Sequence, residues 1–142
     1  MQIKRADAIH DFAILQKLDR QIFPEDDPHP KSKAVWWIVY DDEGNPAGFA
    51  GLEFMDRGRT GFLVRAGLLK HLRGKGIHHR LIRIRERYAK NQGAARAVAY
   101  THTRNAASVN NLIAHGYRVL DPRERANGWG QEGPWIYLAH DL

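Results

Sequence analysis

An apolar run that leads into a basic turn with two glycines constrains the fold of this chain more than any other feature. The segment spans residues 68–77, reads LLKHLRGKGI, and is followed at once by a long helical pattern. Gly74 and Gly76 permit a tight turn and a close approach of the backbone to a ligand. A helix N-terminus after such a turn offers unpaired N–H groups and a favourable dipole to an anion. The spacing therefore predicts a strand, a glycine turn and a helix that hold a phosphate group with main-chain atoms.

This turn does not match the two best-known phosphate motifs. A Walker loop needs Gly-x-x-x-x-Gly-Lys-Ser/Thr, and a dinucleotide fold needs Gly-x-Gly-x-x-Gly. Taken by itself, a glycine turn with Arg and Lys is also compatible with an ordinary solvated turn. The interpretation as a phosphate site therefore depends on what the rest of the chain predicts.

Composition predicts an ordinary globular protein. Apolar residues make up 43% and charged residues 27% of 142 residues, which suits one domain over residues 1–142 with a real core. No window reaches the ~18 uncharged apolar residues of a membrane span, and the N-terminus lacks the apolar core of a signal peptide. We therefore expect a cytoplasmic protein away from membranes. The absence of cysteine excludes disulfides, thiolate metal sites and a cysteine nucleophile.

Charge is distributed unevenly along the chain. The formal net charge is +6, and basic residues concentrate between Lys70 and Lys90, where Glu86 alone opposes them. Acidic residues cluster instead at positions 25–27 and 41–43. A basic segment of this kind fits nucleic acid, a phosphorylated small molecule or a solvated helix face.

Apolar periodicity predicts a mixed α/β fold. Strands are expected at residues 3–4, 36–40, 47–54, 62–69, 95–101, 117–120 and 135–139, and helices at residues 7–22, 77–92 and 105–115, with a further helical turn at 31–34. Asn105 is expected to cap the last helix, and Gly116 to follow it. The strand–helix–strand unit around the glycine turn should pair its strands in parallel. The fold class is a mixed central sheet of about six to seven strands flanked by helices.

This order, with two motifs, resembles the GNAT family of acyl-CoA N-acyltransferases. The family motif Arg/Gln-x-x-Gly-x-Gly/Ala maps onto residues 71–76, and a helix opened by Asn105 closes in Gly116-Tyr117 as the family often shows. The resemblance covers essentially the whole chain. It implies the GNAT fold and an N-acetyltransferase that moves an acetyl group from acetyl-CoA to a primary amine of a small molecule or protein by direct attack. Dimers are common in the family, so a homodimer is one assembly that the resemblance suggests.

The resemblance assigns the coenzyme A site residue by residue. The pyrophosphate is expected on the N–H groups of residues 73–78, and the pantetheine arm along a splayed strand at Leu68 and Leu69, which also offers a donor to the oxyanion. The residues so assigned are Leu68, Leu69, His71, Arg73, Gly74, Lys75, Gly76, Ile77, His78 and Asn105. For Asn105, a helix N-cap without any ligand is an equally complete explanation.

Three positions depart from the family pattern. His71 stands where Arg or Gln is usual, and His78 where Gly or Ala is frequent. Leu112 occupies the position at which many members place the Tyr that protonates the leaving thiolate. A thiol has a pKa of roughly 8.5, so the thiolate of coenzyme A is a tolerable leaving group without that acid.

The attacking amine must lose a proton, and Glu53 is the first candidate for the base. Strand alternation places Glu53 on one face with Phe49 and Gly51. Tyr100 and His102, near the end of the strand at 95–101, are further catalytic candidates. A surface or structural role explains each of the three side chains as well.

No metal is expected, because His78 and His79 are adjacent and lack the i, i+4 spacing of a helical metal pair. The acceptor is expected between the loops at residues 23–30 and 121–134. In the first of these loops, Glu25, Asp26 and Asp27 suit a cationic amine. The same three residues are equally compatible with a solvated acidic loop that binds no ligand.

Two other functions remain open. Leu112 favours a GNAT-fold module that binds acyl-CoA as a sensor or partner without turnover. The basic helix allows a nucleic-acid-binding domain, but no zinc-finger spacing, RNP-like aromatic motif or coiled coil supports it. We therefore do not expect nucleic acid as the partner.

Overall fold

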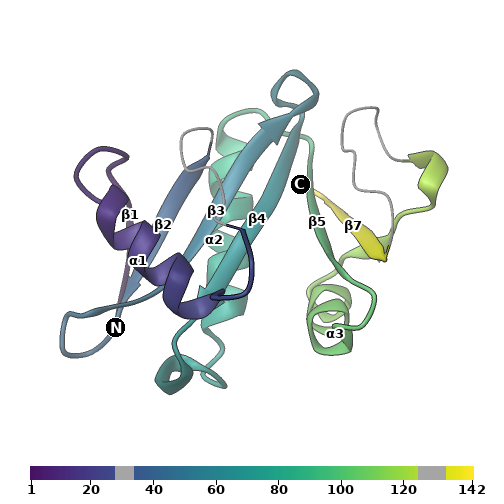
Figure 1. Ribbon diagram of the computed structural model, residues 1–142. Helices are drawn as coiled ribbons and strands as arrows, with labels where there is room; N and C mark the ends of the chain where they lie inside the picture. Colours follow the sequence, from purple (N-terminus) through teal and green to yellow (C-terminus); the bar gives the residue numbers. More distant parts are fainter. Residues whose placement is uncertain (28–33, 125–133) are drawn as a thin grey trace. The chain divides into compact units, whose positions relative to one another are not determined.

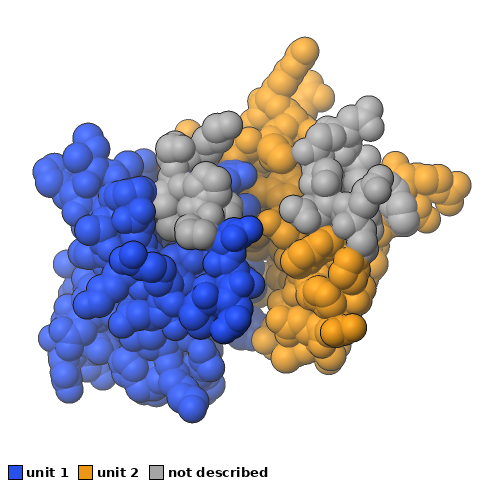
Figure 2. Space-filling model, in the orientation of Figure 1, with its two compact units in different colours: residues 1–53, 64–85 blue, residues 54–63, 86–142 orange. Residues whose placement is uncertain are grey.

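The computed structural model describes residues 1–27, 34–124 and 134–142. The chain forms two compact units (Figure 2). Unit 1 consists of residues 1–53 and 64–85, and unit 2 of residues 54–63 and 86–142. The predicted helical turn at 31–34 and most of the predicted loop at 121–134 lie outside the described residues.

The predicted order of strands and helices is confirmed. The elements are β1 (Gln2–Arg5), α1 (Phe12–Ile22), β2 (Val35–Tyr40), β3 (Pro46–Met55), β4 (Thr60–Leu68), α2 (Ile77–Asn91), β5 (Arg96–His102), α3 (Ala106–Ala114), β6 (Arg118–Val119) and β7 (Trp135–Asp141). Short 3-10 turns are η2 (Asp56–Gly58), η3 (Lys70–Leu72) and η4 (Pro122–Glu124). The seven strands form one mixed sheet in the order β1-β2-β3-β4-β5-β7-β6. In the described part of the chain, no helix has both the length and the apolar character needed to cross a membrane.

In unit 1, helices cover both faces of the strands (Figure 1). Helix α1 buries Leu15 and Leu18 on one face, while residues 77–85 of α2 lie on the other. Beneath α2, Leu81 packs in one apolar cluster with Ala50 of β3 and Leu68 of β4. The β2–β3 pair is the predicted antiparallel hairpin.

Helix α1 begins at Phe12, so the predicted start at Asp7 is wrong. The Asp7 carboxylate accepts the backbone N–H groups of Ile9 and His10, and thereby holds residues 7–10 in a turn. A short acidic side chain competes with helical hydrogen bonding in this way. As a result Ile9, which the periodicity counted among the helical apolar residues, is 84% exposed.

Arg85 is buried inside unit 1, on the inner face of α2. Its Nε donates to the Leu81 carbonyl, and its Nη1 donates to the carbonyls of Gly51 in β3 and Val64 in β4. These bonds compensate the burial of the guanidinium and tie α2 to two strands. Arg85 therefore does not belong to the basic surface that the sequence suggested for this helix.

In unit 2, β5 pairs in parallel with the first four residues of β4, from Thr60 to Leu63. Its other edge pairs antiparallel with β7 over its whole length. The Asn105 side chain accepts the Ser108 N–H, so the predicted N-cap of α3 is confirmed. Leu112, on α3, is buried.

The substitution Arg85→Met should lower the free energy of unfolding by about 2–3 kcal/mol, because it leaves buried carbonyl groups without their charged donor. Urea titration followed by tryptophan fluorescence measures this loss. Arg83→Met is the matched control, because Arg83 is exposed on the same helix, and it should change stability by less than about 0.5 kcal/mol. Equal effects of the two variants would contradict the structural role of Arg85.

Candidate functional site

The glycine turn between β4 and α2 has the backbone conformation that the sequence suggested. Gly74 has φ 75° and Gly76 has φ 76°, values that side-chain-bearing residues rarely adopt. Nothing lies within 4 Å of the position that a Cβ would take at either glycine. Helix α2 begins immediately afterwards at Ile77, and no acidic residue stands in its first turn. The turn therefore presents an open backbone surface next to helical N–H groups that have no intrahelical acceptor.

Two side chains of the turn have defined partners. Arg73 Nε donates to the Leu68 carbonyl at 3.2 Å, which fastens the turn to the end of β4. His71 points elsewhere, since its Nε2 lies 3.1 Å from Asp41 Oδ2 at the end of the β2–β3 hairpin. Arg73, rather than His71, is thus the side chain that shapes the turn.

Protonation equilibria near the turn are shifted. Backbone donation from Asn45 is the main cause that lowers the pKa of Asp41, and the contact with His71 lowers it further. Desolvation lowers the pKa of His78, and electrostatic interactions with Arg85, His79 and Arg73 lower it further. His78 is therefore neutral at pH 7, and the positive charges beside the turn belong to Arg73 and Lys75.

The end of β4 uses part of its backbone in hydrogen bonds. The Leu69 N–H donates to the Ala47 carbonyl of β3 at 2.7 Å, and the Leu69 carbonyl accepts the Leu72 N–H. Neighbouring residues of a strand direct their polar groups to opposite edges. The N–H groups of Leu68 and Ala66 therefore point to the edge of β4 that faces away from β3.

The catalytic candidates belong to different units, and each has a defined place in its own unit. Glu53 is half-buried on β3, on the face of Phe49, whose ring packs edge-on against Phe23 after α1. In unit 2, the Tyr100 ring packs against Trp135 and Tyr137. The His102 ring also packs edge-on against Trp135, and its Nδ1 accepts the Arg104 N–H. These contacts show structural roles for both β5 side chains, and catalysis by any of the three remains a prediction.

The acidic segment at residues 25–27 is exposed, and one arginine of β4 contacts it. Arg65 donates through Nη2 to the Asp27 carbonyl at 3.0 Å, and its Nη1 lies 3.9 Å from the Asp26 carboxylate. Arg65 also forms a buried ion pair with Asp19 of α1 at 2.7 Å. Sequence reasoning missed Arg65, although a lone charge inside an apolar strand was a visible signal.

A second cluster that sequence reasoning missed surrounds Glu86 in unit 2. The carboxylate accepts the Tyr117 hydroxyl at 2.7 Å and contacts His140 Nδ1 at 2.9 Å and His115 Nε2 at 3.1 Å. Desolvation raises the pKa of Glu86, but the bonds from His140, Tyr117 and His115 outweigh it and lower the pKa overall. The visible signal was an isolated acid in a strongly basic helix.

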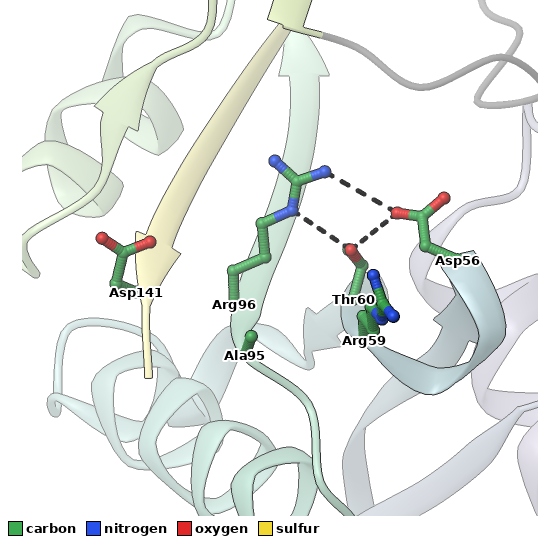
Figure 3. Close-up of a pocket in the computed structure, with 6 residues that line it drawn as sticks. All are labelled: Asp56, Arg59, Thr60, Ala95, Arg96 and Asp141. Atoms are coloured by element: carbon green, nitrogen blue, oxygen red, sulfur yellow. Dashed lines mark hydrogen bonds and ion pairs between the residues drawn. The ribbon is translucent and has the colours of Figure 1, made fainter.

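A pocket in unit 2 lies where β4 and β5 begin (Figure 3). Asp56, Thr60 and Arg96 turn toward one another there: Thr60 Oγ1 donates to Asp56 at 2.7 Å, and Arg96 Nε donates to Thr60 Oγ1 at 3.1 Å. Ligands of parallel α/β units bind instead beyond the carboxyl ends of the strands, where the glycine turn lies. The described residues include no group of three or more His, Asp or Glu side chains that could hold a metal ion.

Comparisons with known proteins identify a family from the sequence and a fold from solved structures. The model of the acetyltransferase (GNAT) family matches residues 6–117. An IAA acetyltransferase from Bacillus cereus has a TM-score of 0.78 at 19% identity, with 99% of each chain covered. An acetyltransferase from Bacillus subtilis in complex with CoA has a TM-score of 0.77 at 18% identity, with 99% of this chain and 98% of that chain covered. At such identities the likeness establishes the fold. A comparison with curated proteins finds no match.

The Glu86 cluster makes stability depend on pH. Because the folded-state pKa of Glu86 lies below its ordinary value of 4.5, the carboxylate stabilises the fold above that value, and the contribution disappears as pH falls through the folded-state pKa. Glu86→Gln should therefore cost about 2 kcal/mol at pH 7 and progressively less below pH 4.5. Urea titrations across this range measure the difference. Glu43→Gln, at an exposed turn residue, is the control, and a pH-independent loss in Glu86→Gln would refute this account.

Proposed function

Since the chain belongs to the acetyltransferase (GNAT) family, we propose that it transfers the acetyl group of acetyl-CoA to a primary amine by direct attack. Acetyl-CoA is the cosubstrate of this family, and related structures contain coenzyme A. The observation that carries the proposal is the glycine turn, which joins two left-handed glycines to the start of α2. The acceptor is an amine of a small molecule or of a protein.

The glycine turn fits a pyrophosphate. Substituents at Gly74 and Gly76 would fill the space above the turn, which the glycines leave open. The Arg73 N–H already donates to the Lys70 carbonyl, so the N–H groups of residues 74–78 then hold the phosphate oxygens, and the dipole of α2 favours their negative charge. Arg73 and Lys75 supply positive charge at neutral pH, while the neutral His78 supplies none.

The contacts of the turn favour an alignment in which the family motif begins at Arg73 and not at His71. Placed from Arg73, the pattern Arg/Gln-x-x-Gly-x-Gly/Ala matches at its first position, Arg73, and its fourth, Gly76, while His78 stands at the sixth in place of Gly or Ala. In this register, the side chain at the first position bonds the Leu68 carbonyl and shapes the turn. His71 then lies before the motif, in agreement with its contact to Asp41.

The chemistry requires a donor for the oxyanion and an acceptor for the amine proton. Of the two expected donors at the end of β4, Leu69 N–H already bonds Ala47, so Leu68 N–H is the better candidate. Glu53 is the proposed base, directly or through water. Leu112 cannot protonate the thiolate, which leaves without a dedicated acid because its conjugate thiol has a pKa of roughly 8.5.

A module that binds acyl-CoA without turnover is the second candidate, and Leu112 is the observation that favours it. This side chain belongs to the core of unit 2, where a hydroxyl would need a partner of its own. Nucleic-acid binding is less well supported than the sequence alone suggested, because Arg85 is withdrawn from the basic surface.

Isothermal titration with acetyl-CoA tests the phosphate site. Gly76→Glu places a carboxylate in the turn and should weaken binding about tenfold or more, since like charges repel in a site built for an anion. Gly93→Glu is the matched control. Gly93 also has a positive φ, 97°, with nothing within 4 Å of an added Cβ. Gly93→Glu therefore introduces the same charge and a similar backbone strain as Gly76→Glu, but outside the glycine turn. If the two variants bind acetyl-CoA with equal affinity, the turn is not part of the binding site.

Turnover separates an enzyme from a binding module. Because the chain contains no cysteine, a thiol reagent reports released coenzyme A without background from the protein. Release with a member of a primary-amine panel supports the transferase, and tight binding without release from any amine supports the module. A folded protein that does not bind acetyl-CoA would overturn both, and salt-dependent binding to DNA or RNA would then be measured.

A further inference from the structure

We propose that Arg65 is a positioning residue that couples the coenzyme A segment of β4 to the loop at residues 22–27, which receives the amine. The inference rests on the proposed function. The backbone of Arg65 lies in β4, three residues before Leu68, and its side chain reaches the loop at residues 22–27. One residue thus takes part in both halves of the proposed site.

Arg65 has an unusual backbone conformation for a strand residue. Its φ is 30°, in a region that residues with a Cβ seldom occupy. Its Nε is buried and has no hydrogen-bond partner among the described residues. Strain and an unsatisfied donor at one residue both cost stability, and such costs persist where a position serves function.

The side chain of Arg65 clamps the loop from several directions. Nη2 donates to Asp19 in α1 and to the Asp27 carbonyl, and the guanidinium lies 4.5 Å from the centre of the Phe23 ring. In the ion pair with Asp19 the carboxylate is 3% and the Arg65 side chain 16% exposed, so salt screens the pair less than a surface pair. The loop is thereby held at its beginning and at its end.

Gly67, two residues after Arg65 on the same face of β4, makes room for this arrangement. A Cβ at Gly67 would lie 2.5 Å from Ile22 Cγ2 and 3.0 Å from the Phe23 ring. The loop therefore lies directly on the strand backbone. Leu68, on the opposite face, packs with residues of the α2 cluster, so this short stretch of β4 connects the loop and the glycine turn.

This geometry also defines the charge that the acceptor meets. Arg65 makes its short ion pair with the buried Asp19, and its distance to Asp26 is longer, at 3.9 Å. Its single positive charge is thus largely balanced within the clamp. The exposed carboxylates of Glu25, Asp26 and Asp27 keep the loop negative, which favours an amine with a positive group beside the reacting nitrogen.

Hydrogen exchange of the whole chain, read by mass spectrometry with and without coenzyme A, tests the coupling. In the wild type, coenzyme A should slow exchange at residues 73–78 and also at residues 22–27. In Arg65→Met, protection of the turn and the affinity for coenzyme A should remain, the ligand-induced protection of the loop should disappear, and loop exchange without ligand should rise about tenfold. Arg83→Met, at an exposed arginine, is the control and should behave as the wild type.

Two further variants keep the test decisive if Arg65→Met does not fold. Arg65→Lys retains the charge but cannot bridge Asp19 and the Asp27 carbonyl together, so it should lose most of the loop protection. Asp26→Asn removes only the longer ion pair, so this variant should keep the ligand-induced protection of the loop. Loop protection that persists in Arg65→Lys or Arg65→Met overturns the coupling while the proposed function stands. Wild-type protein without protection at residues 73–78 overturns the proposed function itself.

Discussion

Strand β4 has to end and helix α2 has to begin within a few residues, and the two left-handed glycines between them allow this. Three hydrogen bonds of unit 1 support this connection. Arg73 fastens the turn to Leu68, the Leu69 N–H fastens the strand end to β3, and Arg85 ties α2 back to the carbonyl of Val64. The open backbone surface of the turn is therefore held rigidly, as a main-chain anion site requires.

Local chemistry explains which parts of this fold could be predicted from the sequence. Alternation and helical periodicity depend on neighbouring residues, so the strands, α2 and the parallel β4–β5 pair followed from the pattern. The Asn105 cap followed for the same reason, because its acceptor and the Ser108 donor are three residues apart. The start of α1 was placed too early, because the Asp7 carboxylate competes with the helix for N–H groups that the apolar pattern does not report.

Long-range pairs explain what could not be predicted. Arg65 meets Asp19 across 46 residues, and Glu86 meets His115, Tyr117 and His140 across 29, 31 and 54 residues. No periodicity reveals such partners; a charge in an apolar strand and an acid in a basic helix only mark where to search. The glycine turn was found because its chemistry lies in consecutive residues. Glu53, Tyr100 and His102 stay predictions, since their roles depend on substrate atoms that a sequence does not contain.

Amide chemical shifts during an NMR titration with coenzyme A test the central claim most directly. We predict that the largest shifts fall on the backbone N–H groups of residues 74–78, together with those of Leu68 and Ala66 on the edge of β4 that faces away from β3. Saturable binding with its largest shifts elsewhere, such as the pocket around Arg96 or the Glu86 cluster, would contradict it. The absence of any shift in the folded protein would contradict it as well.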